Sequence, residues 1–217
     1  MPVQFRKVAL MLLPFSTTFF VADAQKLQRT DSVFVTVHAS PWKPVAEKDI
    51  EWKIRSWREI PVASQKKAGV TDKKWQSLYD NLCDGIKAGK FRAYAGTDDR
   101  FTHPLSTEEF SVLTNGVFRQ TVTKYLIKED LLKLKSAGPK QTKIVGLAPV
   151  TNKSGATPTR PLFWIFYPDA IDYLAKAVCT KDQSWFDMFE NRNFTSTVTK
   201  TADTIRARAV PVAENKQ

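Results

Sequence analysis

The chain has 217 residues, 42% of them hydrophobic and 12% aromatic, and its formal net charge at pH 7 is +11. A length near 200 residues predicts one domain or a small pair of domains. The apolar content, with only eight glycines and twelve prolines, excludes a linker, a fibre and a chain that is disordered over most of its length.

The first 24 residues have the order of a secretory signal peptide. Arg6 and Lys7 form a positive start, an apolar stretch follows, and a small-x-small triplet ends at Ala24, directly before Gln25. A membrane-spanning helix is the alternative, but it needs about 20 apolar residues. Pro14 and a hydroxyl triplet interrupt this stretch. We therefore expect cleavage between Ala24 and Gln25 and no direct membrane span.

Export changes what the positive charge indicates. Removal of the leader takes away two positive residues and one negative residue, which leaves a net charge of +10. A cytoplasmic chain this basic would indicate nucleic acid. An exported chain more naturally meets anionic lipid head groups, anionic polysaccharide or an acidic protein, so we expect no nucleic-acid partner. No cysteine lies near the new N-terminus, and no lipid attachment is expected there.

An N-terminal extension with one short strand is expected over residues 25–44. The next block, residues 49–60, is DIEWKIRSWREI. We predict a helix here, with a strand as the alternative. The block holds the densest aromatic and cationic cluster of the chain, which consists of Trp52, Arg55, Trp57 and Arg58. It is either a partner-binding surface, since Trp and Arg are common interface anchors, or an amphipathic packing surface with the indoles inward and the guanidinium groups in solvent.

A helix is predicted from residue 71 onward because apolar side chains recur with a period of 3.6 residues. Thr71 or Asp72 can cap its start, and Gly89 follows its last turn. Cys83 lies on the apolar stripe and is expected to be buried. The stripe consists of Trp75, Leu78, Tyr79, Leu82, Cys83 and Ile86.

The middle of the chain predicts a second helix and then strands. Residues 106–109, STEE, form a capping box, and the helix it begins should end near residues 115–116. Residues 121–128 are rich in β-formers. Residues 140–150 and the uncharged run 162–168 are joined by the polar loop 151–160, which suggests an antiparallel hairpin. A continuous apolar run is expected of a strand that is buried on both faces, so Trp164 is a poor candidate for a ligand contact.

The last third predicts two more helices and a strand. Asp169 is expected as the N-cap of a helix with an apolar stripe that reaches Val178, with Cys179 at its edge, and Ser184 as the cap of a short apolar turn. Residues 194–201 alternate like a strand. The fold expected is α+β, with a mixed, mainly antiparallel small sheet and packed helices in a single compact domain over residues 45–202, followed by a flexible tail over residues 203–217.

Few residues point to catalysis. His38 and His103 are the only histidines, and a nucleophilic pair of Cys83 with His103 is disfavoured because thiols in a core stripe are usually inert. The acidic doublets 98–99 and 108–109 fall in a turn and in the capping box. No P-loop or zinc-ligand spacing is present in the sequence. We predict no catalytic, cofactor-binding or metal-binding residues, and no cofactor.

The two cysteines leave two alternatives open. Cys83 and Cys179 fall on or beside apolar helix stripes, so the two helices could pack together, and an exported protein can form a disulfide. The bond requires Cα atoms within roughly 7 Å. The favoured alternative is two buried thiols.

Several blocks, taken in order, resemble one known family. They are WKIRSWREI (52–60), SLYDNLCDGIKAGKFRAY (77–94), DDRFTHPLSTEEF (98–110), KIVGLAPV (143–150), PLFWIFYPDAIDYLAKA (161–177) and SWFDMFENRNFTSTVTK (184–200). Together they resemble the gliding-motility protein family GldN, called PorN in non-gliding relatives, of the Bacteroidetes. The resemblance covers roughly residues 45–205.

The resemblance implies a non-enzymatic periplasmic subunit of the type IX secretion system. Such a subunit would form a ring beneath the outer membrane with copies of itself and with an outer-membrane lipoprotein of the GldK or PorK type. It would also contact the periplasmic shaft protein of the GldM or PorM type. The chain departs from the family pattern after Arg58 and looks short over residues 61–74 and 151–160. The alternative is an exported polysaccharide- or ligand-binding protein with an aromatic and basic surface.

Overall fold

A computed structural model describes residues 45–63, 65, 70–152 and 160–206. The expected leader with its cleavage point between Ala24 and Gln25, the short strand expected within residues 25–44, and most of the polar loop 151–160 lie outside the described residues.

An antiparallel six-stranded sheet forms the centre of the molecule, with strand order β2-β5-β4-β3-β1-β8. Each strand pairs with its neighbour in the antiparallel sense, and β4 and β5 form the hairpin expected from the sequence. The strands are β1 (Ile50–Pro61), β2 (Ala93–Ala95), β3 (Val122–Leu134), β4 (Gln141–Thr151), β5 (Phe163–Phe166) and β8 (Thr197–Arg206). The α+β prediction is confirmed.

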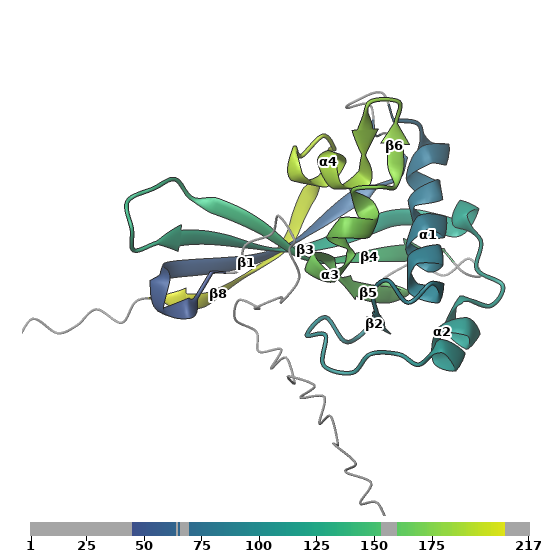
Figure 1. Ribbon diagram of the computed structural model, residues 1–217, viewed down its shortest axis with the longest axis horizontal. Helices are drawn as coiled ribbons and strands as arrows, with labels where there is room; N and C mark the ends of the chain where they lie inside the picture. The colour runs from purple at the N-terminus through teal and green to yellow at the C-terminus, as the bar shows by residue number, and fades with distance from the viewer. Residues whose placement is uncertain (1–44, 64, 66–69, 153–159, 207–217) are drawn as a thin grey trace, which may run out of the picture.

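Helices cover one face of one half of this sheet (Figure 1). They are α1 (Asp72–Lys87), α2 (Thr107–Thr114), α3 (Tyr167–Leu174) and α4 (Trp185–Glu190), and a small sheet of β6 (Val178–Thr180) and β7 (Gln183–Ser184) joins α3 to α4. Short 3-10 turns precede β1 (Glu47–Asp49) and β3 (Arg119–Thr121). None of the helices in the described part of the chain is long and apolar enough to cross a bilayer.

Local chemistry sets the helix starts. The Thr71 side chain accepts a hydrogen bond from the backbone N–H of Lys74 and caps α1. Ser106 and Ser184 each form a complete capping box at the starts of α2 and α4, as the sequence predicts. Such a cap contributes about 1 kcal/mol to helix stability because it satisfies backbone N–H groups that have no partner within the helix.

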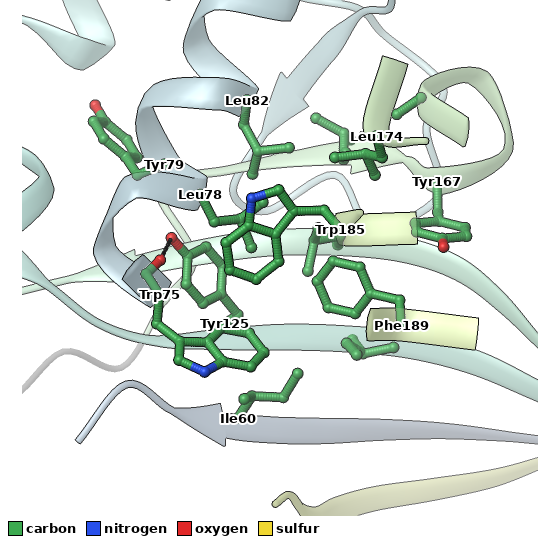
Figure 2. Close-up of a cluster of buried hydrophobic side chains, with 14 of the residues drawn as sticks. Ile60, Trp75, Leu78, Tyr79, Leu82, Tyr125, Tyr167, Leu174, Trp185 and Phe189 are labelled. Atoms are coloured by element: carbon green, nitrogen blue, oxygen red, sulfur yellow. Dashed lines mark hydrogen bonds between the residues drawn. The ribbon is translucent and has the colours of Figure 1, made fainter. Parts of the chain in front are cut away.

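The main core lies between α1, α3, α4 and the sheet, and aromatic side chains dominate it (Figure 2). Trp75 from α1 is fully buried, with its ring centroid 5.2 Å from that of Trp185 and 6.1 Å from that of Tyr125. The Tyr125 hydroxyl donates a hydrogen bond of 2.9 Å to the Trp75 carbonyl oxygen, which ties β3 to α1. The apolar stripe predicted for the helix is therefore its sheet-facing side.

A smaller aromatic cluster covers the opposite face of the sheet. Phe101, from the loop after β2, packs edge-on against Tyr94 and Trp164. It lies directly over Gly146 of β4, where an added Cβ would come within 2.6 Å of the Phe101 ring. The Trp164 indole N–H donates to the Gly96 carbonyl oxygen at 3.1 Å, and Trp164 is only 3% exposed. Both faces of β5 are thus buried, as expected from its uncharged sequence.

Two sequence predictions, the type of one element and the start of another, differ from the structure. Residues 50–61 form strand β1 and not a helix. Helix α3 begins at Tyr167, its N-cap Phe166 makes no side-chain cap, and Asp169 lies inside the first turn. The helix starts early because Pro168, at one of its first two positions, has the backbone dihedral that a helix start requires.

The ends of two elements also differ from expectation. Helix α3 ends at Leu174, so Val178 and Cys179 lie in strand β6 and not on a helix stripe. Strand β8 continues to Arg206, so the sheet includes the first four residues that the sequence analysis assigns to the tail.

The outer parts of β1, β3, β4 and β8 project beyond the helices (Figure 1). We call residues 50–56 of β1 and 129–143 of β3, β4 and their connecting turn the arm. Three of the predicted interaction residues, Arg55, Trp57 and Arg58, lie at or near the base of the arm, and Trp52 lies further out on β1.

Candidate interaction surface at the base of the arm

The four predicted interaction residues all lie on β1, but they do not form one surface. Successive strand residues point to opposite faces of a sheet. Trp52 and Arg58 therefore share the face that the helices cover further along, whereas Arg55 and Trp57 point to the opposite face. A helix would have brought neighbouring members of the cluster together, and the strand separates them.

Arg55 is buried and not solvated, which corrects the alternative that placed the guanidinium groups in solvent. Its Nε and Nη2 atoms donate to the two carboxylate oxygens of Asp130 on β3 at 2.7 and 2.8 Å. Lys53 Nζ lies 4.0 Å from the same carboxylate. Arg55 and Asp130 are 3% exposed and Lys53 is 1% exposed. A bidentate geometry of this kind is the strongest arrangement of an Arg–carboxylate pair.

Trp57 is only partly exposed, and contacts from the loop after β2 and from two neighbouring strands hold its ring in place. Its indole N–H donates to Asp99 Oδ2 at 3.0 Å. Lys128 Nζ donates to the Asp99 carbonyl oxygen at 2.6 Å and lies 5.5 Å from the Trp57 ring centroid. Lys200 of β8 lies over the same ring at 4.4 Å. Trp57 thus holds the loop after β2 against the sheet.

The acidic doublet of this loop has a structural role. Asp98 accepts hydrogen bonds from the backbone N–H groups of Thr102 and His103, at 3.0 and 2.9 Å. Asp99 receives Trp57 and Lys128 from the sheet. These contacts agree with the turn that the sequence predicts for this doublet.

A second charged cluster lies on the helix-covered face. Glu129 of β3 accepts from Arg58 with one carboxylate oxygen and from Arg192 with the other. The Ser56 hydroxyl also donates to Glu129, at 3.1 Å. Only 4% of the Glu129 side chain is exposed. Arg192 lies two residues after the end of α4, so the cluster ties the end of the helix layer to the base of the arm.

The sequence did not identify the acidic partners of Arg55 and Arg58, which are Asp130 and Glu129 respectively. Lys128, Glu129 and Asp130 are three consecutive charged residues within the otherwise apolar run from Tyr125 to Leu132. Adjacent residues of a strand face opposite sides, so this triplet places Glu129 on one face and Asp130 on the other. A charged triplet inside a β-rich segment was the signal that could have found them.

The cysteines occupy the main core as free thiols, which is the alternative favoured from the sequence. Burial raises the pKa of Cys83 and that of Cys179 to about 11, so both are protonated and weakly nucleophilic at neutral pH. His103 is exposed in the loop after β2, where its Nδ1 lies 2.8 Å from the Thr102 hydroxyl oxygen, whereas Cys83 is buried on α1. The structure does not bring Cys83 and His103 together.

A groove between α1 and α3 has a volume of about 720 Å³. Two lysines and two aspartates lie among its lining residues, which are Asn81, Lys90, Asp169, Asp172, Tyr173, Lys176, Ala177 and Val178. Within the described residues, no three His, Cys, Asp or Glu side chains come together as metal ligands.

Comparison with known proteins gives one informative match. The family model described as gliding motility associated protein GldN matches residues 45–210. A search of curated proteins finds no match. The matched range contains the whole sheet, all four helices and both charged clusters at the base of the arm. The chain therefore belongs to the GldN family of gliding-motility proteins, which are components of the type IX secretion machinery.

Proposed function

We propose that this chain is a non-enzymatic structural subunit of the type IX secretion and gliding-motility machinery. It acts in the periplasm, at the inner face of the outer membrane, and forms a ring with its own copies and with an outer-membrane lipoprotein of the GldK or PorK type. It also contacts the shaft protein of the GldM or PorM type. The match of the GldN family model to residues 45–210 carries this proposal.

The arrangement of the charged residues supports a scaffold. The buried charged side chains all make structural contacts within the sheet or to the loop after β2; they are Lys53, Arg55, Lys128, Glu129 and Asp130. Removal of one partner from a buried ion pair is strongly destabilising, so these contacts hold parts of the fold together. The signal peptide expected at residues 1–24 supports export, and the absence of a nearby cysteine supports attachment through a partner and not through a lipid of its own.

A genetic experiment tests this function. Deletion of the gene should abolish type IX secretion, and plasmid-borne full-length chain should restore it. A version without residues 2–24 should fail to restore secretion, because it would remain in the cytoplasm. Normal secretion in the deletion strain would contradict the proposal, and rescue by the leaderless chain would contradict the periplasmic location.

The alternative function, an exported polysaccharide- or ligand-binding protein, has one observation in its favour. Trp52 and Trp57 are the partly exposed tryptophans among the described residues, and aromatic faces of this kind can bind sugars or other ligands. Both rings already have a lysine over them, Lys140 and Lys200 respectively. Retardation of the purified chain in gels that contain anionic polysaccharide, lost in Trp52→Ala, would favour this alternative.

A further inference from the structure

The loop between β2 and α2 crosses the sheet on the face opposite to the helices, and we call its residues 96–104 the strap. Its two ends are fixed. Ala95 is the last residue of β2, and the Leu105 N–H donates to the Ala93 carbonyl oxygen at 2.8 Å, directly before the capping box at Ser106. Between these ends, the contacts that the strap makes with the described sheet come mainly from side chains and not from a backbone ladder.

Asp98 holds the strap together as one unit. Its carboxylate accepts hydrogen bonds from the backbone N–H groups of Thr102 and His103, at 3.0 and 2.9 Å, and from the Thr102 hydroxyl at 3.1 Å. Its own N–H donates to the Ala95 carbonyl oxygen at 2.8 Å. An aspartate that bonds the backbone ahead of it closes a turn on itself. These bonds therefore lie within the loop and do not attach it to the sheet.

Asp99 and Phe101 are the two anchors that attach the strap to the sheet. Asp99 Oδ2 accepts from the Trp57 indole N–H at 3.0 Å and lies 3.6 Å from Lys128 Nζ, which also donates to the Asp99 carbonyl oxygen at 2.6 Å. Phe101 is 1% exposed, and its ring fills the hollow over Gly146. One anchor is thus a charged hydrogen-bonded contact and the other is an aromatic ring in a hollow.

The closed position of the strap strains its backbone at Phe101. The φ angle of this residue is 61°, in the left-handed region that a Cβ disfavours and a bulky side chain rarely adopts. Such a backbone persists only where the surrounding structure holds it, and residues of this kind concentrate at switch regions. The ring in its hollow and the contacts of Asp99 supply that hold. Opening lets Phe101 return to an ordinary backbone conformation, so the strain favours opening.

We propose that the strap is a conformational switch that opens as one unit about its two ends. In the closed state it covers Trp57 and Trp164, and Asp99 accepts from the Trp57 indole. In the open state the Trp57 indole, the Lys128 ammonium group and the hollow over Gly146 are exposed. Segments held by few contacts open locally at a lower free energy than the whole domain. The opening is a property of the isolated chain and goes beyond the proposed function.

The tryptophans of the chain report the position of the strap, because hydroxyl radicals oxidise an indole more when it is more exposed. Oxidation of each tryptophan in the purified mature chain is measured by mass spectrometry. Trp57 reports one side of the strap, and Trp164, whose indole N–H donates to the Gly96 carbonyl oxygen at 3.1 Å, reports the other. Trp75, which is 0% exposed in the main core, reports unfolding of the whole domain. Trp52, on the opposite face of β1, is the reference for the radical dose.

Each variant removes one anchor, and its effect is measured at the other. Asp99→Ala removes the partner of Trp57 and should raise the oxidation of Trp164 by at least about fivefold, because a lost hydrogen bond to a charged group shifts a local equilibrium by about tenfold or more. Phe101→Gly removes the ring from its hollow and should raise the oxidation of Trp57 by a similar factor. Oxidation of the core tryptophan should stay unchanged in both variants.

Two further variants complete the design. Asp80→Ala makes the same change in net charge at an exposed pair with Arg119 and should change the oxidation of either strap tryptophan by less than about twofold. Phe101→Ala removes the ring as Phe101→Gly does, but alanine is disfavoured at a φ of 61° and glycine is not. Trp57 should therefore be oxidised at least about twofold more in Phe101→Ala than in Phe101→Gly.

Three results would overturn the switch. Oxidation that rises at Trp57 alone in Asp99→Ala would mean that the strap does not move as a unit. Oxidation of Trp75 that rises by the same factor as that of Trp164, in both anchor variants, would mean that the whole domain unfolds and the strap has no opening of its own. Equal oxidation of Trp57 in the two Phe101 variants would mean that backbone strain does not favour opening. None of these results bears on the proposed function, which the deletion strain tests separately.

Discussion

Removal of the Asp130 carboxylate should strongly destabilise the fold, because it would remove the bidentate partner of the buried Arg55 and the carboxylate beside the buried Lys53. The two hydrogen bonds to Arg55 are 2.7 and 2.8 Å long, and all three residues are 3% exposed or less. Breaking a buried pair from one side costs about 3–5 kcal/mol. For a domain of this size, 1 kcal/mol corresponds to about 2–4 °C in Tm. Asp130→Ala should therefore lower the Tm by about 6–20 °C.

Chemical denaturation provides the assay and a surface pair provides the control. The free energy of unfolding of Asp130→Ala is compared with that of the unaltered chain by urea titration, followed by tryptophan fluorescence. In the control, Asp80→Ala, the lost partner is Arg119 at 3.0 Å, in a pair whose side chains are 44% and 51% exposed. An exposed pair contributes no more than about 1 kcal/mol.

A double variant separates the effect of pairing from that of burial. Arg55→Met with Asp130→Leu replaces the pair by apolar groups of similar size and should recover much of the stability lost in Asp130→Ala. If Asp130→Ala costs no more than the Asp80→Ala control, the Arg55–Asp130 pair does not stabilise the base of the arm, and the reasoning is refuted.

Two further predictions concern local packing and pH. Gly146→Val should destabilise the fold by about 1–3 kcal/mol, because its Cβ would come within 2.6 Å of the Phe101 ring. Gly138→Ala, which meets nothing within 4 Å, should leave the urea midpoint nearly unchanged, and equal effects of the two would contradict the close packing on β4. Hydrogen bonds from Ser184 lower the pKa of Asp187 below its usual 3.8, so this cap stabilises the fold above about pH 4 and is lost as the pH falls through the lowered pKa. The stability difference between the unaltered chain and Ser184→Ala should therefore shrink between pH 6 and pH 3, and a difference that grows on acidification would contradict this assignment.

The parts of the fold that could be predicted from the sequence depend on neighbouring residues. The stripe from Trp75 to Ile86 and the caps at Ser106 and Ser184 are signals within one or two helical turns, and the structure confirms them. The polar loop between two apolar runs was enough to predict the β4–β5 hairpin.

The interaction residues were harder to place because their partners are distant in sequence. Arg55 binds Asp130, 75 residues away, and Arg58 binds Glu129, 71 residues away. Buried charges interrupt the period-2 pattern of apolar residues that would have identified β1 as a strand. The misplaced start of α3 has a local cause, since Pro168 begins the helix earlier than the acidic cap signal at Asp169 indicates.

The assembly state of the chain with its lipoprotein partner tests the central claim most directly. The mature chain is co-expressed with the soluble part of the GldK- or PorK-type lipoprotein, purified through a tag on the lipoprotein, and its mass is measured by light scattering during gel filtration. We expect the two proteins to elute together as an assembly far larger than one copy of each. Separate elution, with this chain at the mass of a monomer and no mixed complex, would contradict the account of the chain as a ring subunit.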